Sequence, residues 1–159
     1  MSRLATRRPS PRLVLCTLLL VTTAGIAAQQ KAAAPGSTYA RESKGTRILE
    51  APGVGIKVLV EAANYGSGEV EVAELTLSST SAEHRHTSSE IIYVLEGVLE
   101  HVVNGETHRI EPGMVGIVKP GDTVVHRVVP PGPVKALLVW APGGEADRLA
   151  KLFKTRPVE

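Results

Sequence analysis

Cysteine is almost absent from this chain of 159 residues, which has only Cys16. That residue lies in an N-terminal stretch that we expect to be removed, so the mature protein would contain no thiol. Disulfide bonds, thiolate metal sites and cysteine nucleophiles are then excluded for the mature chain.

Long apolar runs and basic, aromatic-rich patches are also lacking. The longest apolar stretch, residues 13–28, is interrupted by threonines and a glycine and is shorter than the ~20 residues that span a bilayer. No basic patch with interleaved aromatic residues indicates a nucleic-acid partner. No glycine-rich loop precedes a helix in the way that phosphate binding requires. We therefore expect neither nucleic acid nor, once the N-terminal stretch is cleaved, a membrane as a partner.

Residues 1–28 have the three parts of a secretory signal: a basic start, an apolar core at 13–23 and a small-residue exit at 24–28. Cleavage is expected after Ala27 or Ala28, which predicts a periplasmic or secreted protein. An uncleaved membrane anchor is the alternative. The signal carries four of the 18 Lys+Arg and none of the 16 Asp+Glu, so its removal changes the net charge from +2 to −2.

The rest of the chain divides into a leader, a β-rich domain and a short tail. Residues 29–45 have no periodic apolar face, which predicts a disordered leader. Residues 46–142 contain short β-branched runs between Gly, Pro and Asn turn signals, which predict an antiparallel sandwich or barrel. Residues 143–159 form the tail, with a helix over 144–154. The expected strands are 47–51, 56–63, 69–77, 90–95, 98–103, 107–110, 114–118, 124–129 and 134–140.

Asn104-Gly105 is the clearest hairpin signal in the sequence. It stands between two apolar runs, and a type I′ turn requires positive φ at both central residues. We therefore expect strands 98–103 and 107–110 to pair directly.

A His-x-His-x3-Glu cluster formed by His84, His86 and Glu90 carries the strongest chemical signal, and a further histidine, His126, follows downstream. Imidazole nitrogens and a carboxylate oxygen are the donors that bind divalent first-row metals. Alternation along a strand points His84 and His86 to the same face. An antiparallel barrel can fold His126 over the same pocket, leaving one or two coordination positions open.

Other histidines and charged residues receive structural roles. We expect His101 and His108 to lie on exposed strand faces, because neither has a partner at ligand spacing. Alternation turns Arg85 and Arg127 away from their neighbouring histidines. Core packing is the expected role of two aromatic residues, Tyr93 and Trp140.

On these residues the chain resembles the cupin superfamily, whose members are small jelly-roll β-barrels. Its first motif is represented by His84-x-His86-x3-Glu90-x6-Gly97 and its second by residues 113–126, and the resemblance covers roughly 48–142. Two positions depart from the family pattern: Ser78 stands where a glycine is usual, and Pro130 where an asparagine is usual.

The resemblance implies an all-β jelly-roll barrel with one divalent transition metal held by His84, His86, Glu90 and His126. The metal could be Fe, Mn, Ni, Cu or Zn, since imidazole suits most of these and carboxylate favours Mn and Fe. It also implies dimers, because such barrels often pair through sheet edges.

Two functions remain open at this point. The first is an exported metalloenzyme that acts on a small oxygen-bearing substrate, with dioxygenase-like chemistry favoured over isomerase or lyase chemistry and Glu90 as a candidate base. The second is a non-catalytic module that uses the metal to bind a small ligand or to brace the barrel. Few acid or base groups other than Glu90 and the histidines can be placed in the pocket, which favours metal-based chemistry or none.

Overall fold

The computed structural model describes residues 44–66 and 68–159. The predicted signal, its cleavage sites, Cys16 and the predicted leader up to residue 43 lie outside the described residues. Among the described residues, no helix is long and apolar enough to cross a membrane.

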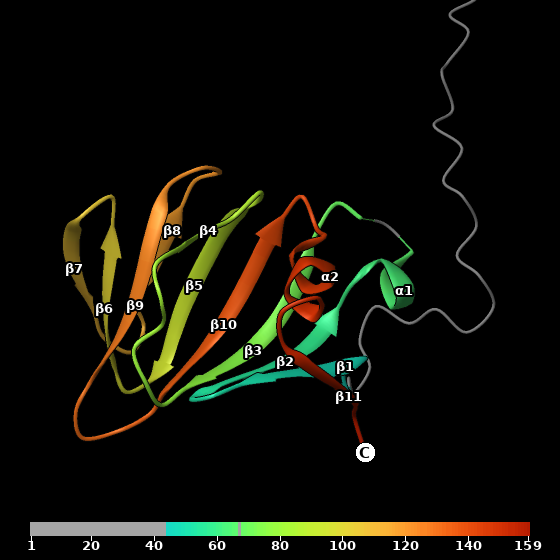
Figure 1. Ribbon diagram of the computed structural model, residues 1–159, viewed down its shortest axis with the longest axis horizontal. Helices are drawn as coiled ribbons and strands as arrows, with labels where there is room; N and C mark the ends of the chain where they lie inside the picture. Colours follow the sequence, from blue (N-terminus) through green and yellow to red (C-terminus); the bar gives the residue numbers. More distant parts are fainter. Residues whose placement is uncertain (1–43, 67) are drawn as a thin grey trace, which may run out of the picture. The chain divides into compact units, whose positions relative to one another are not determined.

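Two antiparallel β-sheets form the domain (Figure 1). The larger has seven strands in the order β11-β1-β2-β3-β10-β5-β8, and the smaller has four in the order β4-β9-β6-β7. This arrangement confirms the expected all-β fold of the jelly-roll type. The strands are β1 (Arg47–Ala51), β2 (Val54–Val60), β3 (Glu71–Leu77), β4 (His84–Arg85), β5 (Ser89–Glu96), β6 (Val98–Val103), β7 (Glu106–Ile110), β8 (Val115–Val118), β9 (Thr123–Val129), β10 (Val134–Ala141) and β11 (Lys154–Pro157).

Alternation along the strands builds the core between the sheets. In β3 the side chains of Ala73, Leu75 and Leu77 are buried while those between them are more exposed. Burial of each leucine contributes roughly 1.5–3 kcal/mol. Both sheets contribute, since Leu99 of β6 and Ile110 of β7 belong to the same buried cluster.

The outward face of β5 is also apolar, and it corrects one expectation. Tyr93 was expected in the core but is 39% exposed, on the same side of the strand as Ile91 and Leu95. The inward residues of β5 begin with Glu90, so the strand buries a carboxylate and exposes an aromatic ring. Trp140 is buried, as expected.

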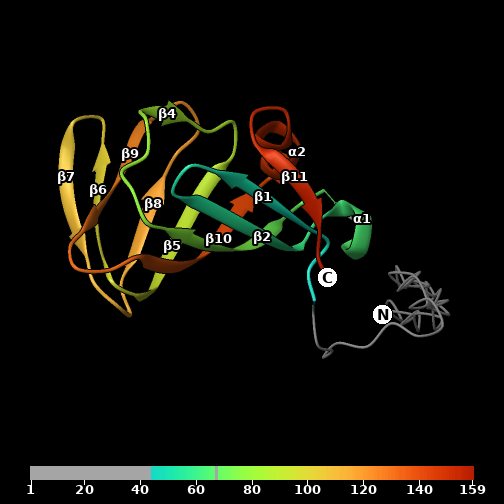
Figure 2. The ribbon, with the colours of Figure 1, turned by 60° about the horizontal axis from the view of Figure 1, so that its bottom comes forward.

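The C-terminal segment differs from a single helix over 144–154. The helix α2 covers Glu145–Ala150 only, and β11 follows it and pairs with β1 (Figure 2). Without β11, the outer edge of β1 would expose unpaired backbone groups. Pro157 is compatible with a strand here because β11 is itself an edge strand. A second short helix, α1 (Ala62–Tyr65), lies between β2 and β3 and was not expected.

The hairpin between β6 and β7 forms as predicted. Asn104 and Gly105 have φ of 51° and 85°, the positive values of a type I′ turn. The Asn104 side chain also ties this turn to β9: its Oδ1 accepts a hydrogen bond from the Thr123 backbone N–H at 3.0 Å, and its Nδ2 donates to Asp122 at 2.8 Å.

We predict that Asn104→Ala lowers the free energy of unfolding by about 1–3 kcal/mol, because alanine tolerates positive φ poorly and loses both hydrogen bonds. Urea denaturation followed by circular dichroism measures the change. Glu106→Ala, which alters an exposed neighbour in β7, is the control and should stay within about 0.5 kcal/mol of the parent. An equal effect of the two substitutions would contradict the role assigned to the turn.

Candidate metal centre

The four predicted ligand residues come together between the two sheets. His84 lies in β4, His86 directly follows that strand, Glu90 lies in β5 and His126 in β9. The strands β4 and β9 are paired, with His84 opposite Val124, so the two segments of the smaller sheet face Glu90 of the larger one. Thr87 and Ser88 lie in the connection from β4 of the smaller sheet to β5 of the larger one.

Glu90 is at the centre of these contacts. Its Oε2 lies 3.3 Å from His86 Nε2, and its Oε1 lies 3.4 Å from His126 Nε2. The His84 ring completes the group, with its centroid 4.9 Å from that of His86 and 5.3 Å from that of His126. The predicted residues are therefore neighbours in space, although 42 positions of sequence separate His84 from His126.

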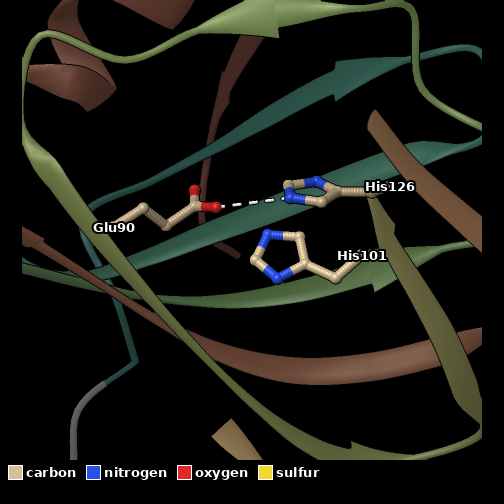
Figure 3. A group of neighbouring side chains, drawn as sticks. All are labelled: Glu90, His101 and His126. Carbon is tan, nitrogen blue, oxygen red and sulfur yellow. Dashed lines mark ion pairs between the residues drawn. The ribbon is translucent and has the colours of Figure 1, made fainter. Parts of the chain in front are cut away.

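His101 also belongs to this cluster, and the expectation that it is exposed was wrong. It lies in β6 directly opposite His126 of β9, and its side chain is only 1% exposed. One ligand atom from each of Glu90, His101 and His126 lies within 4.8 Å of the other two (Figure 3). The sequence did contain a signal: His101 has the same strand parity as Leu99, which packs inward. His108, by contrast, is exposed as expected.

A glycine of the other sheet holds His101 in place. A Cβ at Gly116 in β8 would lie 2.3 Å from His101 Nδ1 and 2.6 Å from Ile110 Cδ1. Only a residue without a side chain permits this approach. The Nδ1 edge of the imidazole therefore packs against the backbone of β8, and Nε2 remains as the nitrogen that can serve the cluster.

The polar atoms of the cluster fit a metal ion. Among the described residues, His86 Nε2, Glu90 Oε1, His101 Nε2 and His126 Nε2 are buried without a hydrogen-bond partner. Unsatisfied buried polar atoms are costly and uncommon, at about 1–3 kcal/mol each. Coordination of a divalent first-row metal would satisfy them, because neutral imidazoles and a carboxylate are its usual ligands.

Protonation states also suit metal binding. Burial would raise the pKa of Glu90, but His126, His86 and the Trp140 N–H outweigh it and hold that pKa at about 2. Burial lowers the pKa of His101 to about 4 and also lowers the pKa of His84. At neutral pH the carboxylate is ionised and these imidazoles are neutral, which are the forms that bind metals.

Two residues outside the cluster support it. Trp140 of β10 donates from Nε1 to Glu90 Oε2 at 2.8 Å, a contact that core packing alone does not require. Glu145, at the start of α2, has its Oε2 3.5 Å from His86 Nδ1. Its Oε1 accepts hydrogen bonds from the Thr87 N–H at 2.6 Å and the Ser88 N–H at 3.2 Å.

Glu145 fixes the segment that carries His86, although the sequence analysis did not identify it. It is fully buried, which would raise its pKa, but His86, Thr87 and Arg148 outweigh burial and hold the pKa of Glu145 far below its usual range. A carboxylate beside the second nitrogen of a ligand histidine fixes the orientation of the ring. No local sequence pattern joins positions 86 and 145.

A cavity of about 350 Å³ adjoins the cluster. One part of its wall consists of His84, His86, Glu90 and His126, whereas His101 is not among the lining residues. The volume is in the range of small-molecule sites. Most of the remaining wall is apolar and includes Ile56, Leu75, Leu77, Leu138 and Phe153.

Comparisons with known proteins agree with the fold. A family model described as a cupin domain matches residues 68–141. An RmlC-like cupin from Shewanella frigidimarina aligns with a TM-score of 0.57 and 18% identity, over 70% of this chain and 96% of that one. A predicted oxalate decarboxylase from Thermotoga maritima aligns with a TM-score of 0.56 and 19% identity, over 66% of this chain and 99% of that one.

The protein KdgF from a Halomonas species gives a TM-score of 0.53 at 16% identity, over 62% of this chain and 91% of that one. At such identities these likenesses concern the fold alone. No curated relative matches the sequence at a significant level. The family model identifies residues 68–141 as a cupin domain, and the solved structures share its double-sheet fold.

Proposed function

We propose that this protein is an exported metalloprotein that binds one divalent transition metal and acts on a small oxygen-bearing organic molecule. The observation that carries the proposal is the group of buried, unpartnered nitrogen and oxygen atoms beside the cavity. His84, His86, Glu90 and His126 would hold the metal, and His101 is an additional candidate ligand. The mixed donor set is compatible with Fe, Mn, Ni, Cu or Zn. Export is proposed from residues 1–28.

The metal and the residues of the site would have different chemical roles. A bound metal would supply Lewis-acid polarisation of an enolate, diol or carboxylate or, if redox-active, electron transfer to O2. Among the described residues, Glu90 is the one carboxylate on the cavity wall, so it is the acidic side chain that would face a bound molecule. A pKa held at about 2 makes it a good ligand and a weak base. Because Glu90 is a better ligand than base, we favour metal-centred, dioxygenase-like chemistry, with isomerase or lyase chemistry as alternatives.

Two copies are proposed to associate through the outer face of β5 and β8. Ile91, Tyr93 and Leu95 of β5 and Val115 and Ile117 of β8 are 39–61% exposed. The strand register puts Ile91 opposite Ile117 and Tyr93 opposite Val115, so these side chains form one apolar strip. Contiguous exposed apolar patches typically mark interaction surfaces. The proposed dimer contact therefore includes the outer face of β5 and β8 as well as the backbone edge of β8.

We predict that the purified protein contains about one metal ion per chain and that His84→Ala/His86→Ala abolishes stoichiometric metal. Elemental analysis without chelator or histidine tag measures the content. Circular dichroism should still show a β-fold, because the core between the sheets does not depend on these histidines. His108→Ala, which removes an exposed histidine, is the control and should retain metal.

The identity of the metal then directs the search for activity. Fe, Mn, Ni or Cu would justify oxygen-uptake screens on small enols and diols, whereas zinc alone would favour isomerase, lyase or structural roles. Tight metal binding by the double variant would show that the site is assigned incorrectly. No metal after reconstitution with each candidate would overturn the metalloprotein proposal in favour of a metal-free binding barrel.

Gly116→Ala should weaken metal binding about tenfold, because the new Cβ would displace His101 from its position beside Glu90 and His126. Competition with a chromogenic chelator measures the affinity. Gly55→Ala in β2 is a matched control, since a Cβ there would meet nothing within 4 Å. Unchanged affinity in a folded Gly116→Ala variant would remove His101 from the metal site.

Ile117→Glu is expected to convert dimers into monomers, because a charge would be buried in the apolar strip of β5 and β8. Light scattering after size exclusion measures the mass. Tyr65→Glu, which alters an exposed apolar residue of α1, should leave the dimer intact. A monomeric parent protein at micromolar concentration would contradict the proposed association.

A further inference from the structure

Among the described residues, Arg148 in α2 is the one Lys or Arg on the wall of the cavity beside the metal centre. We infer that the cavity takes an organic acid with an apolar body, whose carboxylate binds the guanidinium of Arg148. This inference deepens the proposed function and rests on it only for the end of the molecule that faces the metal ligands.

Arg148 has unused hydrogen-bonding capacity. Its Nε donates to Glu145 Oε2, while its Nη2 is buried and has no hydrogen-bond partner among the described residues. A guanidinium carries five N–H donors in a planar fork that matches the two oxygens of a carboxylate. Its side chain is 30% exposed and lies on the cavity wall.

The apolar wall indicates what lies between the two ends. Ile56, Leu75, Leu77, Leu138 and Phe153 surround the space with hydrocarbon. A sugar or another polyhydroxylated molecule would leave hydroxyl groups without partners there, at a cost for each. An alkyl or aryl body would instead gain from burial. The wall thus selects a molecule with few polar groups apart from its ends.

Glu145 links Arg148, the proposed anchor for the carboxylate, to the candidate metal ligands. Its Oε2 accepts from Arg148 and also lies 3.5 Å from His86 Nδ1. The same carboxylate therefore sets the positions of both, and Glu145 is a positioning residue for the anchor. With a divalent cation and neutral imidazoles, Glu90, Glu145 and Arg148 would leave one net positive charge, which a monoanion would neutralise.

Isothermal titration calorimetry with hexanoate and hexanol tests the anchor, because these probes share an alkyl body and differ in charge. The protein is used as purified, with its metal content measured. We expect it to bind hexanoate about tenfold more tightly than hexanol. Arg148→Gln should abolish this preference and leave hexanol binding unchanged. Arg148→Lys should retain part of it, because lysine offers a point charge without the fork.

Arg127→Gln removes an exposed arginine of β9 that pairs with Glu100, and it should keep the full preference. Thermal denaturation checks that each variant is folded; should Arg148→Gln fail to fold, Arg148→Lys must still show a smaller preference than the parent. Equal binding of the two probes by the parent would overturn the inference. A preference for hexanoate that survives Arg148→Gln would also overturn the inference. The carboxylate would then be assigned to the metal, and the proposed function would remain intact. An Arg148-dependent preference in protein that binds no metal would support the anchor and overturn the metalloprotein proposal.

Discussion

An ionised carboxylate, that of Glu90, lies buried between the two β-sheets, and its neighbours must offset the free energy of burying its charge. Glu90 is only 1% exposed. Removal of a carboxylate from water costs several kcal/mol even in a relaxed protein interior. Trp140 supplies a hydrogen bond, and His86 and His126 approach the two oxygens. One oxygen, Oε1, still has no hydrogen-bond partner among the described residues. A cation at this point would offset the buried charge, so the stability of the site would depend on metal binding.

The strands of the two sheets supply this arrangement in complementary ways. The larger sheet contributes Glu90 and Trp140, which are direct partners across β5 and β10. The smaller sheet contributes the imidazoles, with His101 and His126 as direct partners across β6 and β9. Packing one inner face on the other therefore sets the carboxylate against the imidazoles. Gly97 permits the connection between the sheets, because its φ of 78° and its approach to the Pro133 carbonyl leave no room for a Cβ.

Local patterns account for what the sequence predicts well. Period-two alternation and turn residues located the strands from β1 to β10 except β4, whose two residues, His84 and Arg85, are too few to show a period. The Asn-Gly turn and the buried Trp140 followed from the same local rules. The spacing of His84, His86 and Glu90 identified residues that the fold gathers, because all three lie on the short segment from β4 to the start of β5.

What could not be predicted depends on contacts between distant segments. His101 was assigned to the surface because ligand spacing was the criterion, whereas the cross-strand position opposite His126 decides its burial. Glu145 received no role from the sequence, because its hydrogen bonds reach back to Thr87 and Ser88. The strand β11 was not predicted, because it depends on pairing with β1, at the opposite end of the domain sequence. Tertiary context overrode local propensity in each case.

The strands and the C-terminal segment contribute different parts of the cavity wall. The strands provide the candidate metal ligands, while the segment that begins with α2 provides Arg148, Leu149, Leu152 and Phe153 to the wall. In the proposed function, the barrel therefore determines where the metal binds, and the C-terminal segment determines which molecule fits beside it. Glu145 joins the two parts, since it contacts His86 and Arg148 with the same oxygen. Substitutions at Leu149 or Phe153 can reshape the apolar wall without contact to any candidate ligand, whereas a change at Glu145 would disturb both the anchor and the metal centre. Fold alone does not fix function in such barrels, and in the proposed function the residues that add specificity lie on the short C-terminal segment that packs against them.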